Sequence, residues 1–119
     1  MDINRLLKKI RMHPDSHKMG MIASHLGIVR GSSRDNRKVI GIEVAYDLNA
    51  INDIIQEIKK LPGIVEVLVE VNDGQLDVGD EILFVAVGGD IRENVFQALM
   101  KAVDLIKKRA SRKIEIFED

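Results

Sequence analysis

The sequence predicts an α+β protein in which helices pack on an antiparallel or mixed sheet. Strand-like stretches follow one another in pairs, which favours antiparallel pairing over the strand–helix alternation of a parallel sheet. Three other stretches repeat apolar residues every three or four positions, as amphipathic helices do. The expected order is helix, two strands, helix, two strands, helix and a final strand.

Length and composition limit the classes of protein to which this chain can belong. The 119 residues predict one domain over residues 1–119 that buries a core without disulfides. Apolar residues make up 45% of the chain, which excludes wholesale disorder. A net charge of −1 and only 3% aromatic residues argue against a general nucleic-acid binder. The sequence lacks an apolar run of membrane-spanning length and the apolar core of a signal peptide, so we expect a cytoplasmic protein.

Metal chemistry is not expected. The chain has no cysteine, which excludes disulfides, thiolate metal sites and cysteine nucleophiles. His13 and His17 are four residues apart, but Pro14 interrupts any helix that would align them.

Three helices are predicted, over Ile3–Ile10, Ile51–Leu61 and Asp90–Arg109. Asp2 and Asp90 are predicted N-caps, and Glu93 follows Asp90 at the spacing of a capping box. Pro14 and Pro62 follow the first two helices, where the chain can no longer continue helically. The basic end of the third helix suits the exposed carbonyl groups of a helix C-terminus.

Five strands are predicted, over Gly20–Arg30, Val39–Tyr46, Ile64–Val71, Glu81–Val87 and Lys113–Phe117. The first is expected to carry Ile22, Leu26 and Ile28 on one face, and Gly27 inside it indicates a bulge or a close backbone approach. We expect the first two strands to form a hairpin and the apolar fourth strand to be central. Gln75–Asp80 is expected to be a short connection, and Gly88-Gly89 to end the fourth strand.

The loop Arg30–Lys38 carries four cationic side chains against Asp35 alone. One interpretation is a solvated hairpin tip. The other is an anion-binding loop, because glycine and serine expose backbone N–H groups beside the guanidinium groups of Arg30, Arg34 and Arg37. The spacing of a P-loop is absent, so a nucleoside triphosphate site is not indicated.

Several motifs occur in a distinctive order along the chain. They are Gly27-Ile-Val-Arg30 at the end of the first strand, the strand Val39–Tyr46, Gly74-Gln-Leu-Asp-Val-Gly-Asp80 leading into the fourth strand, and Arg92, Phe96, Ala98 and Asp104-Leu-Ile-Lys107 in the long helix. In order and separation these motifs resemble the molybdopterin synthase large (catalytic) subunit, a MoaE-like family, over roughly residues 20–110.

The resemblance implies an α/β-hammerhead fold, a homodimer and no resident cofactor. It implies binding of a small ubiquitin-like sulfur-carrier subunit, whose C-terminal thiocarboxylate enters a pocket of the large subunit. The implied reaction moves sulfur from that thiocarboxylate to cyclic pyranopterin monophosphate, forming molybdopterin. Arginine and lysine suit such a pocket, because the substrate is a phosphate ester and the donor is an anion.

The resemblance also implies roles for individual residues. Lys107 matches the family's helix lysine, which assists the chemistry, and Arg30 and Arg92 match positions that bind anionic groups. Arg34 and Arg37 are further candidates for anion binding, from the basic loop.

Three family positions hold different residues here. Ile91 and Val71 stand where the family has histidine, and Ile114 falls at its second catalytic lysine. Lys113 lies one residue away and is the candidate replacement, although a one-residue slip in a strand turns a side chain to the opposite face.

Three functions therefore stay open. The chain is a working sulfur transferase, or a divergent non-catalytic dimeric relative that acts as a binding or regulatory module. The third alternative is an unrelated α+β module whose basic loop binds RNA or an acidic partner.

Overall fold

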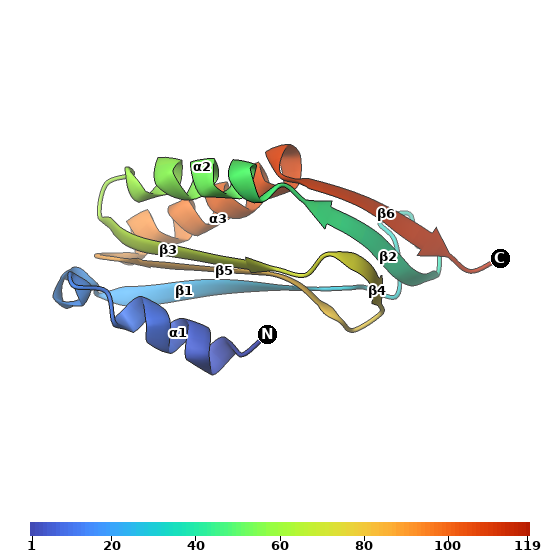
Figure 1. The fold of residues 1–119 in the computed structure, drawn as a ribbon, viewed down its shortest axis with the longest axis horizontal. Coiled ribbons are helices and arrows are strands. Elements are labelled where there is room, and N and C mark those ends of the chain that lie inside the picture. Colours follow the sequence, from blue (N-terminus) through green and yellow to red (C-terminus); the bar gives the residue numbers. More distant parts are fainter.

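The computed structural model describes residues 1–119 as three α-helices and six strands in two antiparallel sheets (Figure 1). The helices are α1 (Ile3–Arg11), α2 (Leu48–Lys59) and α3 (Arg92–Arg109), and a 3-10 turn, η1, covers Ser16–Lys18. The strands are β1 (Met21–Ile28), β2 (Val39–Tyr46), β3 (Ile64–Val71), β4 (Gly74–Asp77), β5 (Glu81–Gly89) and β6 (Ser111–Phe117). The predicted α+β class is confirmed, but the strands form two sheets rather than one.

The first sheet has the order β1-β5-β3, so the predicted central position of β5 is confirmed. Helices α2 and α3 cover one face of this sheet and α1 covers part of the other (Figure 1). Val85 and Val87 of β5 pack in the core beneath α2 and α3, whereas Phe84 and Ala86 pack against α1. Because both faces of β5 are buried, its sequence is continuously apolar instead of alternating.

The paired glycines at the end of β5 do not break the strand, so that prediction is wrong. Gly88 and Gly89 are paired with both neighbouring strands. A Cβ atom on Gly88 would clash with the sulfur of Met19, and one on Gly89 would lie 2.6 Å from the carbonyl oxygen of Gly63. These glycines therefore serve close packing within the sheet.

The second sheet has the order β4-β2-β6. The predicted hairpin of the first two strands is wrong, because β1 pairs with β5 whereas β2 pairs with β4 and β6. Gly74–Asp77, expected within a connection, forms β4 against β2. Alternation marks a strand but does not identify its partner, and β4 is too short to show alternation. A Cβ on Gly41 would lie 2.7 Å from the carbonyl oxygen of Leu76, so glycine permits this pairing.

Two helices begin at aspartate caps and the third does not. The carboxylates of Asp2 and Asp47 each accept a hydrogen bond, at 3.1 Å, from the backbone N–H three residues on. The predicted cap and capping box of α3 are wrong, since Ile91 occupies the N-cap position. Asp90 instead accepts from the N–H of Ile91 and from the side-chain amide of Asn94.

The end of α3 is fastened to the second sheet. The chain passes from α3 through Ala110 directly into β6, and the N–H of Asp47, after β2, donates to the carbonyl oxygen of Ala110 at 2.8 Å. Figure 1 shows the resulting elongated shape, with the second sheet extending beyond the C-terminal end of α3. No helix has the length and apolar character required to cross a membrane.

Candidate active site

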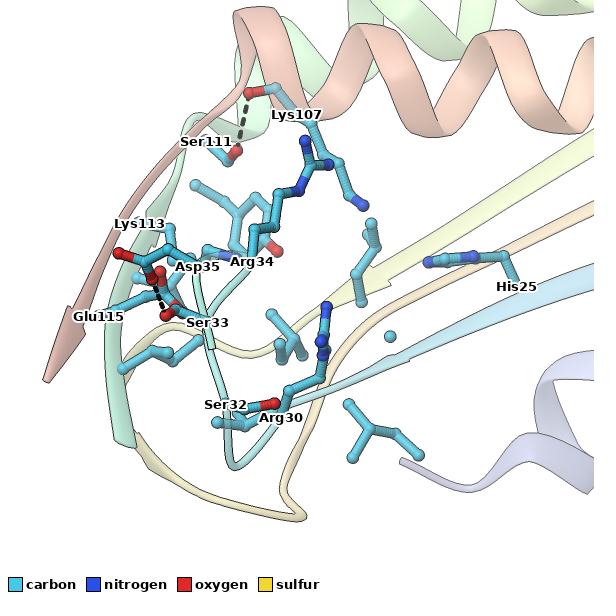
Figure 2. Close-up of a pocket in the computed structure, with 18 residues that line it drawn as sticks. His25, Arg30, Ser32, Ser33, Arg34, Asp35, Lys107, Ser111, Lys113 and Glu115 are labelled. Carbon is cyan, nitrogen blue, oxygen red and sulfur yellow. Dashed lines mark hydrogen bonds between the residues drawn. The ribbon is translucent and has the colours of Figure 1, made fainter. Parts of the chain in front are cut away.

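A cavity of about 770 Å³ lies between the two sheets at the C-terminal end of α3 (Figure 2). Its wall includes the end of β1 and the loop that follows, the inner face of β2, the start of β5, and the beginning of β6. Ile42, Val44, Ile82 and Leu83 supply apolar lining. The volume falls in the range of small-molecule sites, which combine apolar walls with a few polar groups.

Four cationic side chains line this cavity: Arg30 and Arg34 from the loop after β1, Lys107 from α3 and Lys113 from β6. None of the four has a carboxylate within 4.0 Å, although other cations of the chain are paired, such as Arg109 with Glu57 at 3.2 Å. Figure 2 shows Arg30, Arg34 and Lys107 projecting into the same space. Unpaired like charges repel one another, so the cavity favours an anionic ligand.

The register of β6 decides which side chains reach the cavity. Lys113 is the cross-strand partner of Val44, and Ile114 is the partner of Glu43. Val44 is buried and lines the cavity, so Lys113 shares the cavity face. Ile114 points to the other face and is 66% exposed. Lys113 therefore lies on the face of β6 that borders the cavity, and Ile114 does not.

Lys107 lies in the last turn of α3 and directs its amine into the cavity (Figure 2). The Ser111 hydroxyl donates to the Lys107 carbonyl oxygen at 3.1 Å, which ties the helix end to β6. The positions of Lys107 and Lys113 are therefore coupled through one short connection.

The loop after β1 is an ordered turn around Ser33, whose side chain is buried. The N–H of Arg37 donates to the Ser33 hydroxyl at 3.1 Å, and the N–H of Ser33 donates to the Arg37 carbonyl at 2.9 Å. The Ser33 hydroxyl donates to Asp35 and holds the pKa of that carboxyl below its usual value. Because these N–H groups are already bonded, the guanidinium groups of the loop are the better anion ligands.

Two of the predicted anion-binding residues lie outside the cavity. The Arg37 guanidinium stacks on the Phe117 ring, 3.7 Å from its centroid. Arg92 is in the first turn of α3, about 22 Å from Lys107 along the helix axis at 1.5 Å per residue. Its Nε lies 3.9 Å from a carboxylate oxygen of Glu93.

The residues at the other divergent family positions also lie elsewhere. Ile91 is half exposed at the start of α3, and Val71 packs against the main core. Asn72, beside Val71, donates its side-chain amide to the carbonyl oxygen of Glu81 at 2.8 Å.

The sequence reasoning missed His25 and Tyr46, which line the cavity. Alternation in β1 contained the signal, since it puts His25 on the same face as the buried Ala23 and opposite Ile22. Burial, and then the charge of Lys107, lowers the pKa of His25. Burial, and then the nearby Asp73 carboxylate, raises the pKa of Tyr46 to about 12. Both side chains are therefore neutral at physiological pH.

No three histidine, aspartate or glutamate side chains are grouped closely enough to hold a metal ion. His13 instead lies 3.8 Å from Glu66, which also pairs with Lys59 at 3.3 Å.

The fold and the cavity define an α+β protein with a cavity between two sheets that is lined by cationic side chains. A family model described as MoaE protein matches residues 1–109, and the chain belongs to this family, the large subunit of molybdopterin synthase. The predicted resemblance to the molybdopterin synthase catalytic subunit is confirmed, and it places the chain in molybdenum cofactor biosynthesis. No curated protein matches the sequence.

Solved structures share the fold. Molybdopterin synthase from Staphylococcus aureus is 25% identical, with a TM-score of 0.74 over 86% of this chain and 77% of that one. Molybdopterin cofactor biosynthesis protein E from Burkholderia multivorans is 23% identical, with a TM-score of 0.77 over 99% and 86%. A complex of subunits 1 and 2 of molybdopterin-converting factor from Helicobacter pylori contains a chain that is 18% identical, with a TM-score of 0.72 over 99% and 80%.

Proposed function

We propose that this protein transfers sulfur from the C-terminal thiocarboxylate of a small ubiquitin-like carrier to cyclic pyranopterin monophosphate, forming molybdopterin. The observation that carries the proposal is the convergence of Arg30, Arg34, Lys107 and Lys113, without carboxylate partners, on one cavity. The substrate carries a phosphate and the donor is an anion, so both reactants need cationic ligands.

The four cations suit two different tasks. Arginine presents a planar fork that binds a phosphate group through two parallel hydrogen bonds, so we assign the phosphate of the pterin to Arg30 and Arg34. Lysine acts as a compact charge, so we assign Lys107 and Lys113 to the thiocarboxylate and to the negative charge that develops during attack. These two lysines are the catalytic residues of the proposal.

The partner proposed for this chain is the small subunit of the synthase. The similar Helicobacter pylori chain, solved as a complex of subunits 1 and 2 of molybdopterin-converting factor, supports this assignment. A cavity of about 770 Å³ leaves room for a pterin and the narrow end of an extended peptide. The carrier's tail would then bring its thiocarboxylate to Lys107 and Lys113.

We also propose a homodimer of hammerhead-type subunits. Three apolar side chains on or beside the first half of α3 are at least half exposed: Ile91, Phe96 and Met100. Such a surface supports a contact with a second copy of the chain. Arg92 lies beside this apolar surface. In the proposed dimer it would therefore contribute to the cavity of the neighbouring protomer and not to the cavity of its own chain.

Reconstitution tests the function. The purified protein is mixed with a thiocarboxylated carrier and cyclic pyranopterin monophosphate, and molybdopterin is measured. We expect molybdopterin to form only when all three are present. Absence of product with a carrier that supports another molybdopterin synthase would reject sulfur transfer. The non-catalytic alternative would then be favoured if the protein still binds the carrier.

A further inference from the structure

His25 is an ionisable side chain in the cavity to which no role has been assigned. It lies on β1 beside the fully buried Val85 of β5, its cross-strand partner. The imidazole lies next to Gly27, with its Nε2 at an ordinary contact distance, 3.5 Å, from where a Cβ on Gly27 would be. Figure 2 shows the ring directed toward the space that Lys107 and Arg30 also face.

The imidazole of His25 has no hydrogen-bond or ion-pair partner in the protein. His13 provides the contrast, because its Nδ1 accepts from the N–H of Asp15 at 3.0 Å and its Nε2 lies near Glu66. A partly buried imidazole that faces a cavity without a protein partner is free to bond to a ligand.

The charges around His25 disfavour its protonation while the cavity is empty. Helix α3 contributes Lys107, and β5 contributes apolar side chains alone. The remaining ionisable groups are Arg30, Arg34 and Asp35 from the loop, Tyr46 from β2, and Lys113 and Glu115 from β6. Four cations thus face two acids, one of which, Asp35, is already bonded to Ser33. An oxyanion in the cavity would reverse this balance.

We propose that His25 binds a proton when a phosphate-type oxyanion enters the cavity, and so becomes a fifth cation only in the loaded state. The location of the anion rests on the proposed function. His25 is neutral before binding, which limits repulsion among the cavity side chains. Protonation then adds a charged N–H donor beside the ligand.

Proton binding at His25 and anion binding in the cavity are thermodynamically linked, so the affinity for the anion depends on pH. Below the pKa of His25 in the empty protein, the ring is charged before binding and affinity is highest. Between that pKa and the higher pKa of the loaded protein, binding takes up a proton, so affinity falls as pH rises. Each unit of separation between the two values gives about a tenfold change in affinity across this window.

Sulfate is a suitable probe, because it stays dianionic across the pH range in which histidine titrates. The ring protons of all three histidines are followed by NMR from pH 4.5 to 8.5, with and without sulfate. We expect sulfate to raise the pKa of His25 by about one unit, with much smaller changes at His13 and His17. An unchanged His25 titration, with or without sulfate binding in the cavity, would overturn the proposal.

A matched pair of variants separates this role from a structural one. In His25→Gln, sulfate affinity should lose its dependence on pH over the range in which His25 titrates in the wild type, whereas His17→Gln should keep it. Equal pH dependence in both variants would overturn the proposal.

The experiments distinguish a failure of this proposal from a failure of the proposed function. Inactive reconstituted protein with intact proton-linked sulfate binding would reject sulfur transfer alone. Active protein without that linkage would reject the role of His25 alone.

Discussion

Lys113 of β6 and Val44 of β2 are cross-strand partners, and this pairing puts Lys113 on the cavity face while Ile114 faces away. The position that matches the family's second catalytic lysine by count is therefore exposed on the other face of the sheet. The neighbouring lysine occupies the cavity. In the proposed function, Lys113 takes the place of the second catalytic lysine, because its side chain, and not that of Ile114, lies on the cavity face.

Lys113→Ala should lower the rate of molybdopterin formation by about 100-fold, the loss typical of removing a group that stabilises developing charge. Lys113 is exposed, so the melting temperature should change by less than about 3 °C. Activity is measured in the reconstituted reaction and stability by thermal unfolding.

Ile114→Lys provides the matched control. Placed in the Lys113→Ala background, it returns a lysine to the chain on the wrong face of β6, so activity should stay low. Recovery of the lost rate by this second substitution would show that Lys113 does not act from the cavity face.

Lys107→Ala should lower turnover far more than stability. Lys107 is exposed at the end of α3, and removal of such a side chain changes the free energy of unfolding by less than about 0.5 kcal/mol. Lys108→Ala is the control, because Lys108 is an exposed neighbour that does not line the cavity. Parallel losses of activity and melting temperature in Lys107→Ala would indicate a structural role.

The elements were predictable because their signals are local. Amphipathic spacing identified all three helices, and the uninterrupted apolar run of β5 correctly indicated a central strand. Of the two alternatives predicted at Gly27, a bulge or a close backbone approach, the structure supports the bulge, since the register of β1 against β5 shifts between Gly27 and Ile28. Pairing was not predictable, because which strands meet is decided by tertiary packing. The apolar pattern of β2 is the same whether it pairs with β1 or with β4 and β6.

The candidate site was predictable only in part. Charge concentration identified the loop with Arg30 and Arg34, and the family resemblance identified Lys107. His25 was not predicted, because the more conspicuous Ile22, Leu26 and Ile28 mark the opposite face of β1 as the apolar one. In the structure Leu26 and Ile28 are 38% and 49% exposed, because α1 covers only part of that face. The cavity forms where two sheets part, which no single segment of sequence reveals.

Arg92 offers a test of the proposed homodimer. In the proposed homodimer, we expect Arg92 to act on the cavity of the neighbouring protomer. The length of α3 separates Arg92 from Lys107 of its own chain. A heterodimer with Lys107→Ala in one protomer and Arg92→Ala in the other should then retain one complete site.

The measurement uses two affinity tags to isolate that heterodimer. About half of the wild-type rate is expected if Arg92 acts across the dimer, since each active cavity would combine residues of both chains. An inactive heterodimer, made from two variants that are each inactive alone, would mean that both residues act within one chain.

Tyr46 should make the folded protein less stable in alkali. Its pKa is raised to about 12, chiefly by burial and then by Asp73. The unfolded chain loses this phenol proton near pH 10, so between about pH 10 and 12 the unfolded state binds fewer protons than the folded state. Stability must therefore fall as pH rises through this window. Tyr46→Phe should remove that part of the loss and unfold at higher pH than the wild type.

The chain contains one tyrosine and no tryptophan, so the phenolate absorbance near 295 nm reports Tyr46 alone. Its ionisation midpoint in the folded protein should lie well above that of the protein in denaturant. Asp73→Asn should lower the folded midpoint slightly, because burial, the larger cause, remains. Coincident midpoints in the folded and denatured protein would show that the phenol is open to water and that Tyr46 is not buried in the wall of the cavity.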